Sequence, residues 1–124
     1  MANRKKIDKI ERSIINYKGE EYELAFNLNV MEEIQAEYGS VEAWGELVEA
    51  DTEPKAKDIK YGFTAMLNEG IDIYNEEHAC DGFIPRPFFT DKQVGRIISE
   101  IGLFEAAKTL NKTVIESTKT DEKN

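Results

Sequence analysis

The apolar and polar positions near the start of the chain follow the pattern of a β-hairpin. Two apolar runs, residues 12–15 and 22–26, flank a polar segment over residues 16–21. In the second run apolar side chains recur with a period of two, which is typical of a strand with one buried face. Gly19 provides the residue that a tight reversal needs, so the turn is predicted at residues 18–20. Because an isolated hairpin is only marginally stable in water, its apolar face is expected to pack on the helices that follow.

Two short helices are predicted next. Asn29 is the expected N-cap of the first, with Glu32 three residues later in the arrangement of a capping box, and Gly39 is the expected C-cap. Ser40 is expected to cap the second helix, which extends through Glu49. The apolar positions that recur at helical spacing are Val30, Ile34 and Tyr38 in the first helix and Val41, Trp44, Leu47 and Val48 in the second.

A longer helix is predicted over residues 55–77, after a polar segment that contains Pro54. Gly62 and Gly70 each weaken such a helix by up to about 1 kcal/mol relative to alanine. We therefore expect a neighbouring element to approach closely at these two glycines. The apolar face of the helix is expected to hold Ile59, Phe63, Met66 or Leu67, Gly70, Ile73 and Tyr74.

The last third of the chain predicts an extended loop and then a pair of helices. Prolines at two positions exclude a helix from residues 83–89. Thr90 and Gln93 form a second capping-box pair at the start of the next helix. Gly102 is expected to join this helix to the final one, which reaches about residue 117, so that the two form a helical hairpin with almost no connection.

The predicted fold is mainly α, with a small N-terminal β-hairpin and about five helices, of which the last two form the helical hairpin. One domain is expected over residues 12–117. It lies between a flexible basic segment at residues 1–11 and a flexible tail at residues 118–124.

Charge and composition narrow the classes of function. The chain carries a net charge of −9, although residues 1–12 hold five basic and two acidic side chains. A negative field of this kind repels phosphate backbones, so nucleic-acid binding by the folded body is not expected. No apolar run reaches the roughly 18 residues of a membrane span, and the charged N-terminus lacks the apolar core of a secretory signal. With a single cysteine, the expected location is the cytoplasm.

Candidate chemistry is sparse. His78 and Cys80 are the only histidine and cysteine, and a structural zinc site normally takes four such ligands. A Cys–His dyad is the one enzymatic alternative, but side chains at i and i+2 of a helix point in different directions. The simpler interpretation places His78 at a helix C-terminus, where it complements the helix dipole. No phosphate-binding loop or nucleophile elbow is present, so no catalytic residue, metal or cofactor is predicted.

Apolar side chains in the C-terminal third form the candidate site. The four in the predicted loop, Phe83, Ile84, Phe88 and Phe89, either pin the loop to the core or present a binding patch. An apolar stripe on the helix that follows either belongs to the core or lines a groove for a partner helix. The predicted protein-binding residues are Phe83, Phe88, Phe89, Val94, Ile97, Ile98 and Ile101.

Two segments carry a family resemblance. Residues 22–34 read YELAFNLNVMEEI, and residues 87–102 read PFFTDKQVGRIISEIG. Together they resemble the tail assembly chaperones of long-tailed bacteriophages and prophages. In that family a short hairpin precedes a helical body that closes with a threonine-capped helix, a glycine and a final helix. The likeness covers roughly residues 12–117, and helix caps and apolar spacing carry it.

The resemblance implies a non-enzymatic function. Such proteins bind the long, aggregation-prone tape-measure protein, keep it soluble and promote polymerisation of the tail tube around it. They act in the cytoplasm of the bacterial host and are absent from the mature virion. This chain would be the short form, without the frameshifted extension that recruits tail-tube protein, and self-association of the family implies a homo-oligomer.

A second class of protein fits the composition. An acidic inhibitor that mimics the charge of DNA would also be small, helical and negative. Such a protein should array its carboxylates along one surface, whereas Lys92, Arg96, Lys108 and Lys112 interrupt the last two helices. Competition with DNA for a host enzyme would distinguish the two.

Overall fold

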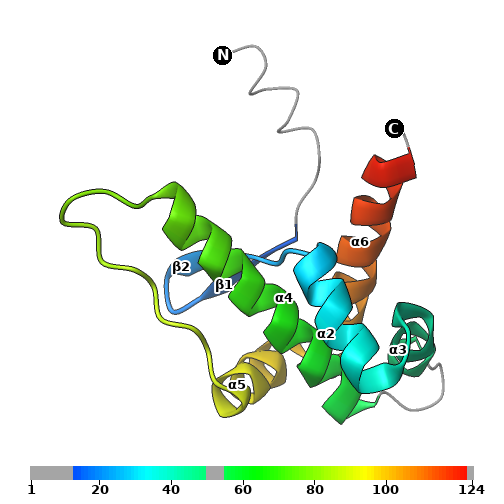
Figure 1. Cartoon of the computed structure of the whole chain (residues 1–124). Helices are drawn as coiled ribbons and strands as arrows, with labels where there is room; N and C mark the ends of the chain where they lie inside the picture. Colours follow the sequence, from blue (N-terminus) through cyan, green and yellow to red (C-terminus); the bar gives the residue numbers. More distant parts are fainter. Residues whose placement is uncertain (1–12, 50–54, 123–124) are drawn as a thin grey trace.

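The computed structural model describes residues 13–49 and 55–122 (Figure 1). It confirms the predicted fold class, because a two-stranded N-terminal hairpin is followed by five helices in these residues. The predicted basic segment at residues 1–11 lies outside them. The elements are β1 (Ile14–Tyr17), β2 (Glu20–Glu23), α2 (Leu28–Tyr38), α3 (Val41–Val48), α4 (Ala56–Glu77), α5 (Asp91–Ile101) and α6 (Leu103–Glu122).

The central element is α4, which contacts β2 and each of the other four helices (Figure 1). It begins and ends within one residue of the expected bounds. Met66 and Leu67 are both fully buried, and so is Ile71, which lies outside the predicted stripe. A helix covered on several sides buries more than one stripe of residues. The core around it includes Ile34, Trp44, Ile59, Phe63, Ile97 and Leu110.

Both glycines predicted to allow a close approach do so. A Cβ atom at Gly62 would collide with the indole ring of Trp44, and one at Gly70 would collide with the backbone carbonyl of Glu23. The chain that leaves β2 therefore lies directly on α4, where the Ala25 amide donates a hydrogen bond to the Met66 carbonyl at 3.1 Å.

The hairpin pairs β1 with β2 in antiparallel register, with Ile15 opposite Tyr22. Lys18 and Gly19 have φ angles of 52° and 81°, so the reversal occupies these two residues and Glu20 already belongs to β2. Positive φ at both positions matches the twist of the strands, and this geometry favours glycine. Ile15 is the buried residue of β1 and belongs to the hydrophobic core.

Most of the predicted helix caps are confirmed, and one is wrong. Ser40 caps α3, and Thr90 with Gln93 forms the expected capping box of α5. The N-cap of α2 is Asn27, whose side-chain oxygen accepts a hydrogen bond from the Val30 amide at 3.3 Å, and not Asn29. Asn29 is already the second residue of the helix, and it donates to Glu69 of α4 at 3.1 Å, a contact that Asn27 also makes, at 2.9 Å.

The last two helices are joined at Gly102 and pack on each other, as predicted. The expected end of α6 near residue 117 is wrong, because the helix continues to Glu122. No glycine or proline follows Ser117 to end the helix. In the described part of the chain, no helix is both long and apolar enough to cross a membrane.

Candidate protein-interaction site

The loop between α4 and α5 is held to α4 by two asparagines seven residues apart on that helix. The Asn75 side chain donates to the Arg86 carbonyl and accepts from the Arg86 amide, at 3.0 and 2.9 Å. Asn68 forms the same pair of bonds with the backbone of Phe89, at 3.0 and 2.8 Å. The loop is thus extended, as predicted, and its backbone is fixed at two points (Figure 1).

Arg86 adds a third attachment, to the hairpin. Its guanidinium lies over the rings of Tyr22 and Tyr74, 4.6 and 4.0 Å from their centroids. The same group donates to the Glu21 carbonyl at 3.0 Å and pairs with the Glu20 carboxylate at 2.9 Å. Contacts of this kind with two aromatic faces and a carboxylate stabilise one loop conformation.

Two of the loop aromatics that were predicted to bind a partner pack against the protein itself. Phe89 contacts the rings of Tyr17 and Tyr22 edge-on, with centroids 5.9 and 5.1 Å away. Phe83 lies against Tyr74 and His78, at 6.3 and 6.1 Å. For Phe83 and Phe89 the pinning alternative therefore describes the structure, and neither is a freely exposed contact.

The predicted stripe on α5 packs mainly on the core, which corrects the assignment of Val94 and Ile97 as binding residues. Val94, Ile97 and Ile98 are buried against α4 and α6. Ile101 is half-buried and packs on the same core. Val94 and Ile97 have almost no accessible surface and cannot contact a partner, so they are removed from the candidate site, whereas Ile98 and the half-buried Ile101 keep part of their surface accessible.

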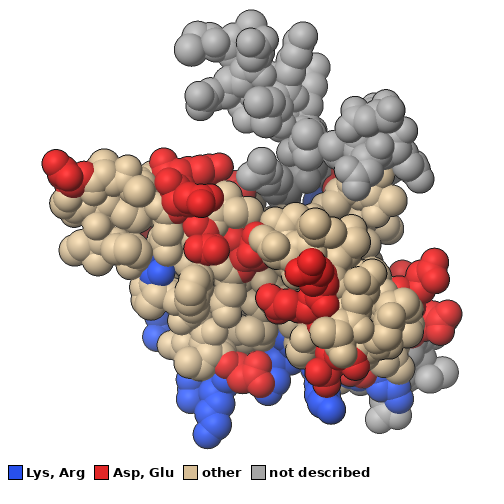
Figure 2. Space-filling model, viewed as in Figure 1, with Lys and Arg blue, Asp and Glu red and all other residues tan. Residues whose placement is uncertain are grey.

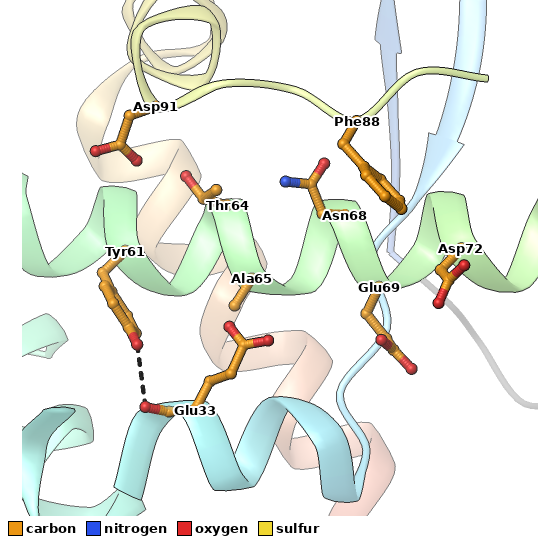
Figure 3. Close-up of a pocket in the computed structure, with 9 residues that line it drawn as sticks. All are labelled: Glu33, Tyr61, Thr64, Ala65, Asn68, Glu69, Asp72, Phe88 and Asp91. Atoms are coloured by element: carbon orange, nitrogen blue, oxygen red, sulfur yellow. Dashed lines mark hydrogen bonds between the residues drawn. The ribbon is translucent and has the colours of Figure 1, made fainter. Parts of the chain in front are cut away.

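Phe88 and Ile84 remain exposed, at 57% and 84% of their surface. Because the backbone of Phe89 is bonded to Asn68, successive side chains in this extended segment point to opposite sides. Phe89 faces the hairpin, and Phe88 lies over α4 on the other side (Figure 3). An exposed aromatic residue on a fixed backbone is a common anchor for a protein partner.

Phe88 forms one wall of an open hollow of about 370 Å³ between α2, α4 and the start of α5 (Figure 3). Four carboxylates from these three helices surround it, and no lysine or arginine lines it. In the described ranges, none of the four forms an ion pair. The lining residues are Glu33, Tyr61, Thr64, Ala65, Asn68, Glu69, Asp72, Phe88 and Asp91.

Tyr61 and Thr64 add hydroxyl groups to the lining of the hollow. Tyr61 donates its hydroxyl to the Glu33 carbonyl at 3.0 Å, and burial followed by the nearby Glu33 and Glu37 carboxylates raises the pKa of its phenol. Thr64 Oγ1 is buried and has no hydrogen-bond partner among the described residues. A hollow of this composition attracts a cationic group, and Phe88 offers apolar contact beside it.

This hollow was not predicted from the sequence. Its carboxylates belong to three helices that lie far apart along the chain, so no local spacing reveals them. The only local signal is the i, i+3 pair formed by Glu69 and Asp72, which is also typical of an ordinary solvated helix face.

The candidate enzymatic pair does not form a dyad. His78 is the C-cap of α4, its ring stacks on Tyr74, and Nδ1 lies 2.8 Å from the Tyr74 carbonyl. Cys80 is exposed beyond the helix end. Within residues 13–49 and 55–122, no group of three or more His, Cys, Asp or Glu side chains is arranged to hold a metal ion.

Comparisons with known proteins assign no family to this chain. No protein-family model, no curated protein and no solved structure matches it.

Proposed function

We propose that this chain is a tail assembly chaperone of a long-tailed bacteriophage or prophage, which binds the tape-measure protein and keeps it soluble while the tail tube polymerises. The observation that carries the proposal is the exposed Phe88 beside four carboxylates that form no ion pair within the described residues. The resemblance of residues 22–34 and 87–102 to this family names the partner.

The physical requirements of a holdase fit this surface. A partner segment that is prone to aggregation needs apolar contacts, and Phe88 with Ile84 supplies them from a loop whose backbone is already fixed. Lysine or arginine residues that flank an apolar residue of the tape measure would pair with Glu33, Asp72 and Asp91. The net charge of −9 would keep the complex in solution.

The family resemblance also supports a second partner, the tail-tube protein, and a location in the bacterial host. In the proposal, a longer frameshifted form brings tail-tube protein to the complex, and the chaperone leaves before the virion is complete. It therefore works without catalysis, in the cytoplasm of the bacterial host.

Co-expression with the tape-measure protein from the same genome tests the proposal. The wild-type chain is expected to increase the soluble fraction of the tape measure and to co-purify with it. The variant Phe88→Ser should weaken this complex by about tenfold or more, because exposed aromatic anchors often contribute the largest share of binding energy. Affinity is measured on the purified proteins by isothermal titration calorimetry.

Phe104→Ser is the matched control, since Phe104 is also an exposed phenylalanine, at 65%, but lies on α6. Both variants should melt within a few degrees of the wild type because neither side chain is buried. Loss of tape-measure solubility only with Phe88→Ser supports the proposal. An unchanged complex with Phe88→Ser, or no complex with the wild type, contradicts it.

The acidic inhibitor that mimics DNA is the second candidate. Carboxylates spread over the face formed by α2 and α4 favour it, whereas the lysines and arginines at the lower edge weigh against it (Figure 2). Displacement of DNA from a host enzyme by the wild-type chain, with no effect on the tape measure, would support the inhibitor instead.

A further inference from the structure

A second open groove, of about 500 Å³, lies between the first turns of α4, the middle of α5 and the start of α6. It shares no residue with the hollow beside Phe88. Its surface is mainly apolar apart from two lysines and a serine. The lining residues are Ala56, Lys57, Lys60, Gly95, Ile98, Ser99 and Leu103.

Gly95 lies in the wall of this groove, in the interior of α5, where glycine costs roughly 1 kcal/mol relative to alanine. The fold does not require it. A Cβ atom at Gly95 would meet only the flexible Lys60 side chain, at an ordinary contact distance of 3.6 Å, whereas one at Gly62 or Gly70 would collide with its neighbours. The missing side chain at Gly95 therefore leaves room on the outside of the protein, where another backbone can approach closely.

Charge favours an acidic occupant. Lys57 and Lys60 border the groove on α4, and Lys92 lies one turn before Gly95 on α5. Figure 2 shows lysine and arginine side chains gathered along the lower edge of the molecule, where Figure 1 places α5 and the start of α4. In a protein with a net charge of −9, this is a local positive field beside an apolar surface.

We propose that this groove binds an acidic amphipathic helix of a partner protein. The apolar stripe of that helix would pack on Ile98 and Leu103, with its backbone close to Gly95. Glutamate or aspartate residues on the edges of the stripe would pair with Lys57 and Lys60. The inference concerns a second surface and stands independently of the tape-measure proposal, whose site selects basic segments.

The probe is a labelled synthetic helix of about 18 residues, long enough to form in water, with leucines along one stripe, alanine at its centre and glutamates at both edges. Fluorescence anisotropy with the full chain at low salt measures its affinity. Amide chemical shifts measured by NMR locate the site, and residues of the groove such as Gly95 and Ser99 are expected to move. A helix with lysine in place of every glutamate is the charge control, and it should leave the amides of the groove unshifted.

The variant Gly95→Ala separates binding from folding. It should raise the melting temperature, because alanine favours the helix, and still weaken binding about threefold or more. Gly45→Ala is the matched control: Gly45 is also a helical glycine without close neighbours, but it lies on α3 outside the groove. This control should stabilise the fold to a similar degree and leave affinity unchanged. The double variant Lys57→Glu with Lys60→Glu should weaken binding about tenfold or more.

Three results would overturn the proposal. One is an affinity that Gly95→Ala does not change, and another is a shift map centred on Phe88. The third is a concentration-dependent dimer of the wild-type chain that Gly95→Ala abolishes, because it would assign the groove to a second copy of this protein.

Discussion

At the scale of single residues, Asp58 connects three helices. The Tyr38 hydroxyl of α2 donates to its carboxylate at 2.6 Å, and the indole nitrogen of Trp44 in α3 donates to its backbone carbonyl at 3.0 Å. Burial, and then the hydrogen bond to the negative Asp58, raises the pKa of the Tyr38 phenol well above its usual range. The neutral phenol is therefore the form that the folded state prefers.

Stability should consequently fall at alkaline pH. Since the pKa of Tyr38 is higher in the folded than in the unfolded chain, its contribution is complete below the unfolded value of about 10 and declines as pH rises above it. The variant Tyr38→Phe should have a free energy of unfolding about 1 kcal/mol lower than the wild type at pH 7. Its stability should also decline less than that of the wild type at alkaline pH. Urea unfolding at pH 7 to 10.5, followed by the fluorescence of the single tryptophan, measures both effects.

Tyr22→Phe is the control for this experiment, because it also removes one phenol but not the bond to Asp58. It should retain the alkaline decline of the wild type. A Tyr38→Phe protein with the same pH profile as the wild type would exclude Tyr38 as its source.

At the scale of elements, the contact between the hairpin and α4 depends on Gly70. The Glu23 carbonyl occupies the space that a side chain at this position would need, and the Ala25 amide bonds to Met66 one turn away. Because both neighbours are backbone atoms, neither can move aside without displacing the strand.

Gly70→Ala should therefore reduce the free energy of unfolding by about 1–3 kcal/mol, although alanine is the better helix former. Gly45→Ala, in an open helical position, should instead increase it by up to about 1 kcal/mol. Chemical denaturation of the two variants measures the difference. A stabilised Gly70→Ala protein would mean that the hairpin does not lie on α4 as described.

Local patterns predicted the elements but not how their side chains are used. The cap at Ser40 and the capping box at Thr90 were predictable because each depends on residues within one turn. Asn27 and Asn29 could both cap α2 by residue type, and both donate to Glu69 of α4, so neither local spacing nor this contact distinguishes them. Hydrophobic spacing on α5 likewise identified an apolar stripe, but only its contacts with α4 and α6 show that this stripe is buried.

The loop aromatics show the same limit for the candidate site. Phe88 and Phe89 are adjacent and chemically identical, so the sequence cannot tell which of them faces the protein. The bonds from Asn68 and the rings of Tyr17 and Tyr22 decide it.

At the scale of the whole molecule, one buried hydrogen bond joins the two ends of the described fold. Thr113 Oγ1 in α6 lies 2.6 Å from Ser13 Oγ, and Thr113 also donates to the Thr109 carbonyl at 2.8 Å. Because Thr113 has a single hydroxyl proton, the Ser13 hydroxyl donates to Thr113. Both residues are buried, so neither can replace this bond with water.

Removing both partners together should therefore cost less than the sum of the two single removals. Thr113→Val alone should destabilise the chain by about 1–3 kcal/mol, because the Ser13 hydroxyl is left buried without this partner. Ser13→Ala alone should cost less, because the Thr113 hydroxyl keeps its bond to the Thr109 carbonyl. The double variant should lose less than the sum of the two single losses. A thermodynamic cycle of urea unfolding measures the coupling, and strictly additive losses would contradict the bond.

The two asparagine clamps on α4 have a consequence for the speed of recognition. Arg86 and Phe89 are bonded on both sides of Phe88 before any partner arrives, so the loop has already lost most of the conformational entropy that binding would otherwise remove. A partner therefore meets a preformed anchor, and its association rate depends on diffusion and on the attraction of its charges to the acidic hollow. Added salt would then slow association more than it hastens dissociation.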